Sequence, residues 1–188
     1  MIKKSSAKFF LLFCSLAALV GTTQPLSAQN AASVQGNIPY RDFTAEHVWD
    51  AKVKIAAPTE LPGGKHGTRR VIPITGGTFT GPKISGDVLP VGEDWQLTRL
   101  DGDTELHARY VLKTSDGYLI QVTNRALWHV PSGGENKTPY IKSVIDLEAP
   151  TNSPYDYLNH AIFIGTLELP KLSPGEAPYV IIGVYKLL

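Results

Sequence analysis

The sequence predicts an all-β fold: a single antiparallel barrel of roughly nine strands with at most a short helical turn. Three observations predict it. Short segments alternate between apolar and polar residues, glycines and prolines separate these segments at near-regular intervals, and no segment keeps a helical apolar period. A sandwich fits the same pattern, but sequential hairpins and the removal of exposed edges by closure favour a barrel.

The first residues have the pattern of an export signal. Three lysines occur within the first eight residues, an apolar run covers 9–20, and Ala28 ends a plausible cleavage site. A retained membrane anchor is the alternative, although the run is short for a bilayer span. We therefore expect a signal peptide at 1–28, a flexible leader at 29–45, a barrel domain at 46–188, and a periplasmic or secreted protein.

Composition limits the chemistry of the mature chain. The only cysteine, Cys14, lies in the signal segment. The mature domain is therefore expected to have no disulfide, no thiol nucleophile and no cysteine-bound metal. Its length is enough for one domain with a sufficient core.

Charge and motifs argue against several partners. The 18 basic and 17 acidic side chains nearly balance and form no basic stripe, so nucleic acid is not an expected partner. The five histidines have no metal-binding spacing, and no phosphate loop or dinucleotide fingerprint is present. We expect no metal and no cofactor.

The first two strands are predicted from their period and their breaks. Residues 46–55 place Trp49, Ala51 and Val53 on one side, which indicates a half-buried strand. Residues 69–79 form a strand that Pro73 and Gly76-Gly77 interrupt, so it is expected to be bent, located at a sheet edge, or bulged. The residues between the two strands are expected to form a loop.

The remaining strands are predicted between turn signals, with a tight hairpin at 101–103 and one helical turn at 155–159. They cover 83–89, 95–100, 104–114, 118–129, 139–147, 161–169 and 179–187.

The strand at 104–114 has two contrasting faces. Leu106, Ala108 and Tyr110 belong to a mostly apolar face, and Glu105 and Arg109 belong to a polar one. From spacing alone, the polar row is more often a solvated outer face. The alternative is that it lines the barrel interior, where the acid and the guanidinium orient each other and a ligand.

Other candidate residues are aromatic or polar and lie near strand ends. Trp95 is suited to core packing or to stacking on a flat ligand. His129 is a candidate acid or base at the end of its strand, although a lone histidine is more often structural. The expected ligand-binding residues are Trp95, Glu105, Arg109, Asn124, Arg125 and Asn159.

Several motifs, in order, resemble the DUF3237 family, also called UPF0311. The resemblance covers about Val48 to Tyr185 and implies a small all-β barrel, without implying an activity. The motifs are Gly67-Thr68-Arg69-Arg70, Pro73-Ile74-Thr75-Gly76-Gly77-Thr78-Phe79, Leu89-Pro90, Asp94-Trp95-Gln96-Leu97, Ala108-Arg109-Tyr110, Asp116-Gly117, Asn124-Arg125, His129, Pro131, Tyr157-Leu158-Asn159 and Phe163-Ile164-Gly165.

Three functions agree with these observations. The barrel is expected to bind a small hydroxylated or aromatic molecule. Alternatively, it is a cofactor-independent isomerase, lyase or cyclase that uses Glu105 or His129 as acid or base with Arg109. The third alternative is a structural periplasmic protein.

Because Arg109 belongs to a matched motif, we expect Glu105 and Arg109 to point into the barrel. The apolar face of the same strand would then lie outside, and a homodimer is expected to cover it.

Overall fold

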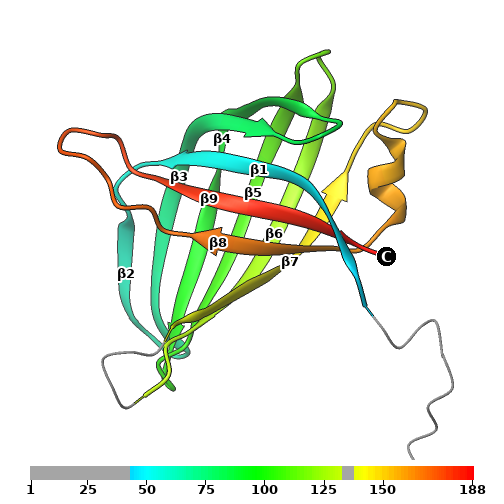
Figure 1. Cartoon of the computed structure of the whole chain (residues 1–188). Coiled ribbons are helices and arrows are strands. Elements are labelled where there is room, and N and C mark those ends of the chain that lie inside the picture. The colour runs from blue at the N-terminus through cyan, green and yellow to red at the C-terminus, as the bar shows by residue number, and fades with distance from the viewer. Residues whose placement is uncertain (1–42, 133–137) are drawn as a thin grey trace, which may run out of the picture. The chain divides into compact units, whose positions relative to one another are not determined.

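The computed structural model describes residues 43–132 and 138–188, in which nine strands form one antiparallel sheet (Figure 1). The expected signal peptide and nearly all of the expected leader lie outside these residues. The strands are β1 (Ala45–Ile55), β2 (Thr59–Gly64), β3 (Gly67–Thr80), β4 (Ser85–Arg99), β5 (Thr104–Thr114), β6 (Leu119–His129), β7 (Tyr140–Glu148), β8 (Phe163–Glu168) and β9 (Tyr179–Leu187), with a 3-10 turn, η1 (Asp156–His160), before β8.

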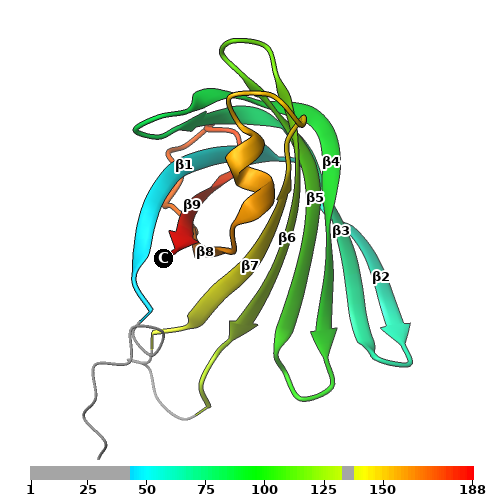
Figure 2. The ribbon, with the colours of Figure 1, turned by 90° about the vertical axis from the view of Figure 1, so that its right-hand side faces the viewer.

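Eight of the strands close into a barrel. The sheet order is β1-β9-β8-β7-β6-β5-β4-β3-β2, and β1 also pairs with β3. The C-terminal half of β3 pairs with β1, whereas its N-terminal half pairs with β2, which is the extra strand outside the closed ring (Figure 2). An eight-stranded barrel has an interior just wide enough for packed side chains or for one small ligand. The predicted all-β barrel is confirmed.

Two strand assignments differ from the sequence prediction. Two expected strands form one strand, and one strand was not expected, so the number of strands is still nine. The expected turn near residues 90–92 is part of one long strand, β4, whose register against β5 shifts between Val88 and Gly92. The irregularity bends the strand instead of ending it. The expected loop after β1 contains β2, which pairs with β3 despite Pro62 because an edge strand has one unpaired side.

The expected irregularity at Gly76-Gly77 is confirmed. The register between β3 and β4 shifts between Pro73 and Gly77. Gly77 has φ 139°, and a Cβ there would collide with the backbone oxygen of Lys52 on β1. The glycine is therefore needed for β1 and β3 to approach closely enough to close the barrel.

The barrel interior is packed at the end where η1 lies. Large side chains that are almost fully buried fill this region, including Trp49, Phe79, Leu112 and Phe163. Leu158 of η1 packs into the same cluster, so the 3-10 turn closes this end of the barrel. The opposite end, near the hairpin at 100–103, contains a cavity. Among the described residues, no helix is long and apolar enough to cross a membrane.

The prediction for the faces of β5 was wrong. Leu106, Tyr110 and Leu112 are buried in the interior, and Glu105 and Arg109 are exposed on the outer surface. Burial of the apolar face removes more apolar area from water, and it avoids desolvating two charged groups. The apolar face that suggested a homodimer therefore lies inside the barrel and provides no surface for one.

Candidate functional site

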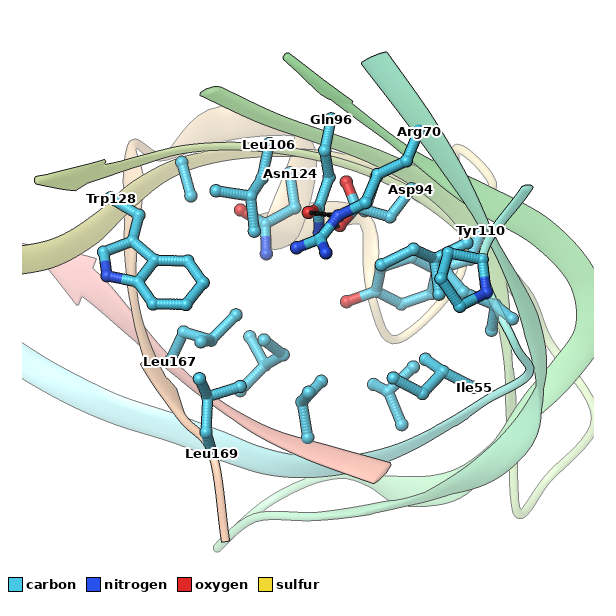
Figure 3. A pocket seen from close by; sticks show the side chains of 18 of the residues that line it. Ile55, Arg70, Asp94, Gln96, Leu106, Tyr110, Asn124, Trp128, Leu167 and Leu169 are labelled. Carbon is cyan, nitrogen blue, oxygen red and sulfur yellow. Dashed lines mark hydrogen bonds between the residues drawn. The ribbon is translucent and has the colours of Figure 1, made fainter. Parts of the chain in front are cut away.

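The cavity at the open end of the barrel has a volume of about 340 Å³ and mostly apolar walls. This volume lies at the lower end of the range for small-molecule pockets. The apolar wall opposite the polar groups includes Leu167 and Leu169 (Figure 3). The polar or aromatic groups that line the cavity are Arg70, Asp94, Gln96, Tyr110, Asn124 and Trp128.

Strand register brings the polar groups together on one wall. Arg70 of β3 is directly opposite Gln96 of β4. Asp94 is opposite Ala108 of β5, which in turn is opposite Asn124 of β6. Side chains two residues apart on a strand share a face, so Asp94 and Gln96 both point inward. Neighbouring strands therefore build one polar patch in an otherwise apolar barrel.

Gln96 joins the two charged groups of this wall. Nε of Arg70 donates a hydrogen bond to Oε1 of Gln96 at 2.7 Å, and Nε2 of Gln96 donates to Oδ2 of Asp94 at 2.5 Å. A guanidinium only donates, so the amide oxygen must face Arg70 and the amide nitrogen must face Asp94. The chemistry of the neighbours thus fixes the orientation of this amide.

Burial raises the pKa of Asp94 above its ordinary value. The hydrogen bond from Gln96, the backbone amide of His107 and the charge of Arg70 act in the opposite direction, but desolvation outweighs them. Perturbed carboxyl groups in cavities occur frequently at functional sites.

Other polar groups at the cavity lack protein partners. Within the described ranges, Oδ1 of Asp94, Oδ1 of Asn124 and Nε1 of Trp128 are buried without a hydrogen bond. The Tyr110 hydroxyl points into the cavity, and burial raises the pKa of Tyr110 (Figure 3). Buried polar groups are nearly always paired, so unpaired ones in the residues that line a cavity make that cavity a candidate ligand site.

The structure places only one of the predicted ligand-binding residues, Asn124, in this cavity. Trp95 is 43% exposed, and its Nε1 donates to Oε1 of Glu93 on the outer surface. Arg125 is exposed on the outside of β6. Trp95 points outward next to Gln96, which points into the cavity. Arg125 points outward next to Asn124, which also points into the cavity.

Glu105 and His129 belong to surface ion pairs. Arg99 donates to Glu105 at 3.0 Å and also pairs with Asp101 and Asp103. His129 Nδ1 lies 2.6 Å from Oδ1 of Asp103. These pairs connect the β4–β5 hairpin to the end of β6, and neither Glu105 nor His129 lines the cavity.

Asn159 does not line the cavity, and its side chain makes structural hydrogen bonds instead. Its side-chain amide accepts a hydrogen bond from the Ala149 amide at 2.8 Å and donates to the Ala149 carbonyl at 3.0 Å. It also donates to Asp156 at 2.8 Å. These bonds hold η1 against the end of β7, on the closed end of the barrel.

Sequence reasoning missed Arg70, Asp94 and Gln96. All three lie in the motifs that carried the family resemblance, so the motifs pointed to the correct strands. The face was misassigned because Trp95 and Arg109 are the chemically more conspicuous members of those motifs. The apolar face of β5 was the signal in the sequence that could have found these residues, because it identifies the side of the strand that points inward. Asp94 and Gln96 are the β4 residues opposite Ala108 and Leu106 of this face.

Within residues 43–132 and 138–188, no group of three or more histidine or acidic side chains lies close enough to hold a metal ion.

Relatives of the chain are small proteins of the same fold. A UPF0311 protein of Rhodopseudomonas palustris (strain TIE-1) is 35% identical over 133 residues, which are 65% of this chain and 82% of that protein. The crystal structure of a conserved protein of unknown function from Rhodopseudomonas palustris has a TM-score of 0.67 at 28% identity, covering 78% of this chain and 99% of that one. A β-barrel-like protein from Acinetobacter baumannii has a TM-score of 0.68 at 30% identity, covering 78% and 97% of the two chains.

A more distant likeness concerns the fold alone. The crystal structure of an enzyme from Penicillium herquei has a TM-score of 0.59 at 20% identity, covering 78% of this chain and 95% of that one.

Residues 43–187 match the family described as "Protein of unknown function (DUF3237)". The chain therefore belongs to the DUF3237 family, which is also named UPF0311.

Proposed function

We propose that the barrel binds one small, mainly apolar ring compound that carries oxygen atoms, in the cavity beside Arg70. The observation that supports this most is the convergence of polar side chains, three of them with unpaired buried atoms, on one cavity of about 340 Å³ with otherwise apolar walls. Ligand pockets typically combine apolar walls with a few placed polar groups. A cavity of this size suits a ligand of one to three fused rings.

The polar groups define what the ligand must offer. Arg70 presents N–H donors, and the Tyr110 hydroxyl donates or accepts. Ketone, phenol or enol oxygens accept hydrogen bonds from these groups, whereas a pure hydrocarbon leaves them unpaired. Hydroxylated or keto-substituted aromatic molecules are therefore the proposed ligand class.

The enzymatic alternative based on Glu105, His129 and Arg109 receives no support from geometry. Glu105 and Arg109 are exposed on the outer face of β5, and His129 pairs with Asp103 at the surface. A substrate in the cavity would have the barrel wall between itself and these side chains. The structural alternative predicts no ligand at all, so a binding measurement separates it from the proposed function.

Binding of 2-naphthol, a flat bicyclic phenol, tests the proposal by isothermal titration calorimetry. We expect saturable one-to-one binding, weakened at least about tenfold in Arg70→Met, because a hydrogen bond to a charged group is lost. Arg109→Met is the matched control: it removes the same charge from an outward position and should bind like the parent protein. Failure of the folded parent protein to bind 2-naphthol, or equal losses in both variants, contradicts the proposal.

A further inference from the structure

The polar wall of the cavity combines an acid and a cation in a way that simple binding does not require. Gln96 holds Arg70 on one side and Asp94 on the other. Within the described residues, Arg70 makes no other hydrogen bond and no ion pair. The guanidinium group points into the cavity, with its terminal nitrogens free for a ligand oxygen (Figure 3).

The position of Asp94 is costly for a site that only binds ketones. Its carboxyl group lines the same wall, and Oδ1 has no hydrogen-bond partner among the described residues. A carboxylate repels the carbonyl oxygen of a ketone, so it opposes binding of the ketones that Arg70 favours, whereas it can accept a hydrogen bond from a ligand hydroxyl. A carboxyl group beside a cation in an apolar cavity is, however, the arrangement needed for proton transfer with a developing oxyanion.

We propose that this wall catalyses cofactor-independent proton transfer next to a ketone, with Asp94 as the acid–base group and Arg70 as the oxyanion-stabilising group. The inference rests on the proposed function, because it needs a ring ketone bound in the cavity. It identifies the substrate class as apolar ring ketones with an acidic α C–H bond. The overall reaction is a tautomerisation or isomerisation.

The step balances within the substrate and one side chain. The Asp94 carboxylate removes a proton from the α carbon, so the C–H bond breaks and an O–H bond forms on Asp94. The C–H electron pair becomes a C=C bond, and the carbonyl oxygen becomes an enolate oxygen that Arg70 stabilises. Asp94 then returns the proton to the oxygen or to another carbon of the conjugated system, and no oxidant or reductant is needed.

The surroundings of Asp94 support this role. Burial raises the pKa of Asp94, which makes the carboxylate a stronger base than an exposed aspartate. Its bond to Gln96 fixes the carboxyl group beside the guanidinium, so the wall is organised before substrate enters. Ala108 lies between Asp94 and Asn124 in the sheet, and Leu106 lies between Gln96 and Ala126, so the wall around Asp94 is apolar, which keeps the local dielectric low.

Hydrogen–deuterium exchange of 2-tetralone tests the inference. This bicyclic ketone has an activated methylene group, and its enol resembles 2-naphthol. Proton NMR in deuterium oxide follows the loss of the methylene signal with parent protein, Asp94→Asn, Arg70→Met and Arg109→Met. We expect the parent protein and Arg109→Met to accelerate exchange, and a folded Asp94→Asn variant to lose about 100-fold or more of that acceleration.

Two readouts separate this inference from the proposed function. Binding of 2-naphthol by the parent protein without acceleration of exchange overturns the proton-transfer role and leaves the binding function standing. Exchange that Asp94→Asn catalyses as fast as the parent also overturns it. If the parent protein does not bind 2-naphthol, both the proposed binding function and the proton-transfer role are contradicted. Because the base must be ionised, the exchange rate should rise with pH through the pKa of Asp94, at a higher pH than for an ordinary aspartate.

Discussion

Arg70 and Gln96 face each other across strands β3 and β4, with Nε of the guanidinium 2.7 Å from Oε1 of the amide. The same amide donates to Asp94, so it separates a cation from an anion that would otherwise pair directly. Direct pairing would satisfy both charges and leave little for a ligand to contact. The amide of Gln96 thus keeps Arg70 available to the cavity.

Replacement of Gln96 with leucine should weaken ligand binding without removing either charge. The guanidinium and the carboxyl group lose their shared partner, and we expect them to pair with each other. The affinity for 2-naphthol should fall about tenfold, as for the loss of one hydrogen bond to a charged group. Calorimetry measures this, with Gln121→Leu as the matched control, since Gln121 alternates with the buried Ile120 and Val122 and has an outward position. Unchanged affinity in Gln96→Leu would show that the amide does not organise the wall.

Replacement of Asp94 with asparagine should stabilise the protein at neutral pH. The folded protein binds the Asp94 proton more tightly than the unfolded chain does, whose carboxyl pKa is near 3.8. The folded state is therefore penalised as pH rises through the folded pKa, and asparagine removes the penalty. We expect Asp94→Asn to have a higher Tm than the parent at pH 7, with a difference that shrinks as the pH is lowered toward 4.

Asp116 provides a control of opposite sign. Hydrogen bonds, first from the Thr114 hydroxyl and then from Tyr155, lower the pKa of Asp116. Its contribution to stability is present above the ordinary pKa and is lost as pH falls through the folded pKa. Asp116→Asn should therefore lower the Tm at pH 7, and its difference from the parent should vanish at low pH. A change in Tm of the same sign for Asp94→Asn and Asp116→Asn at pH 7 would contradict the opposite directions of the two pKa shifts.

Replacement of Gly77 with alanine should impair barrel closure. The new Cβ would collide with the backbone oxygen of Lys52, and the residue would keep φ 139°. We expect a loss of more than about 2 kcal/mol in the free energy of unfolding, measured by urea denaturation. Gly102→Ala is the control: its φ is 93°, but nothing lies within 4 Å of its Cβ, so only backbone strain applies. A smaller loss for Gly77→Ala than for Gly102→Ala would show that β1 and β3 can separate.

Replacement of Asn159 with alanine should affect stability and leave the cavity unchanged. The variant loses the two hydrogen bonds with Ala149 and the bond to Asp156 that hold η1. We expect the free energy of unfolding to fall by about 1–3 kcal/mol, and the affinity for 2-naphthol to remain that of the parent. Reduced affinity in a stably folded Asn159→Ala variant would restore the ligand-binding role that the sequence suggested.

Export of the chain stays a prediction, which N-terminal sequencing of the protein from its own host can test. The basic start and the apolar run at 9–20 predict removal of the segment up to Ala28. We expect the periplasmic or secreted form to begin within a few residues of Gln29. Material that still begins at Met1 would contradict the prediction.

The sequence by itself determined the strands and the class of fold. Alternation between apolar and polar residues marks strands at short range, and glycine and aspartate mark the turns, so β5, β6 and β9 are predictable to within a residue or two. The bulge at Gly76-Gly77 was also predictable, because glycine inside a strand pattern typically marks a bulge or a close approach of two backbones. Several motifs in one order were enough to identify the family.

Only the tertiary structure decided which inward residues of different strands meet in the cavity. In β4 a period of two separates Trp95 from Gln96 without saying which side is buried, and an error of one residue exchanges the whole set. Closure of β1 onto β3 and the register of β3, β4 and β6 bring Arg70, Gln96 and Asn124 to one wall. Arg70 and Gln96 are 26 residues apart in the chain, and Gln96 and Asn124 come together only through the pairing of β4 with β5 and of β5 with β6, so no local pattern in the sequence encodes this wall.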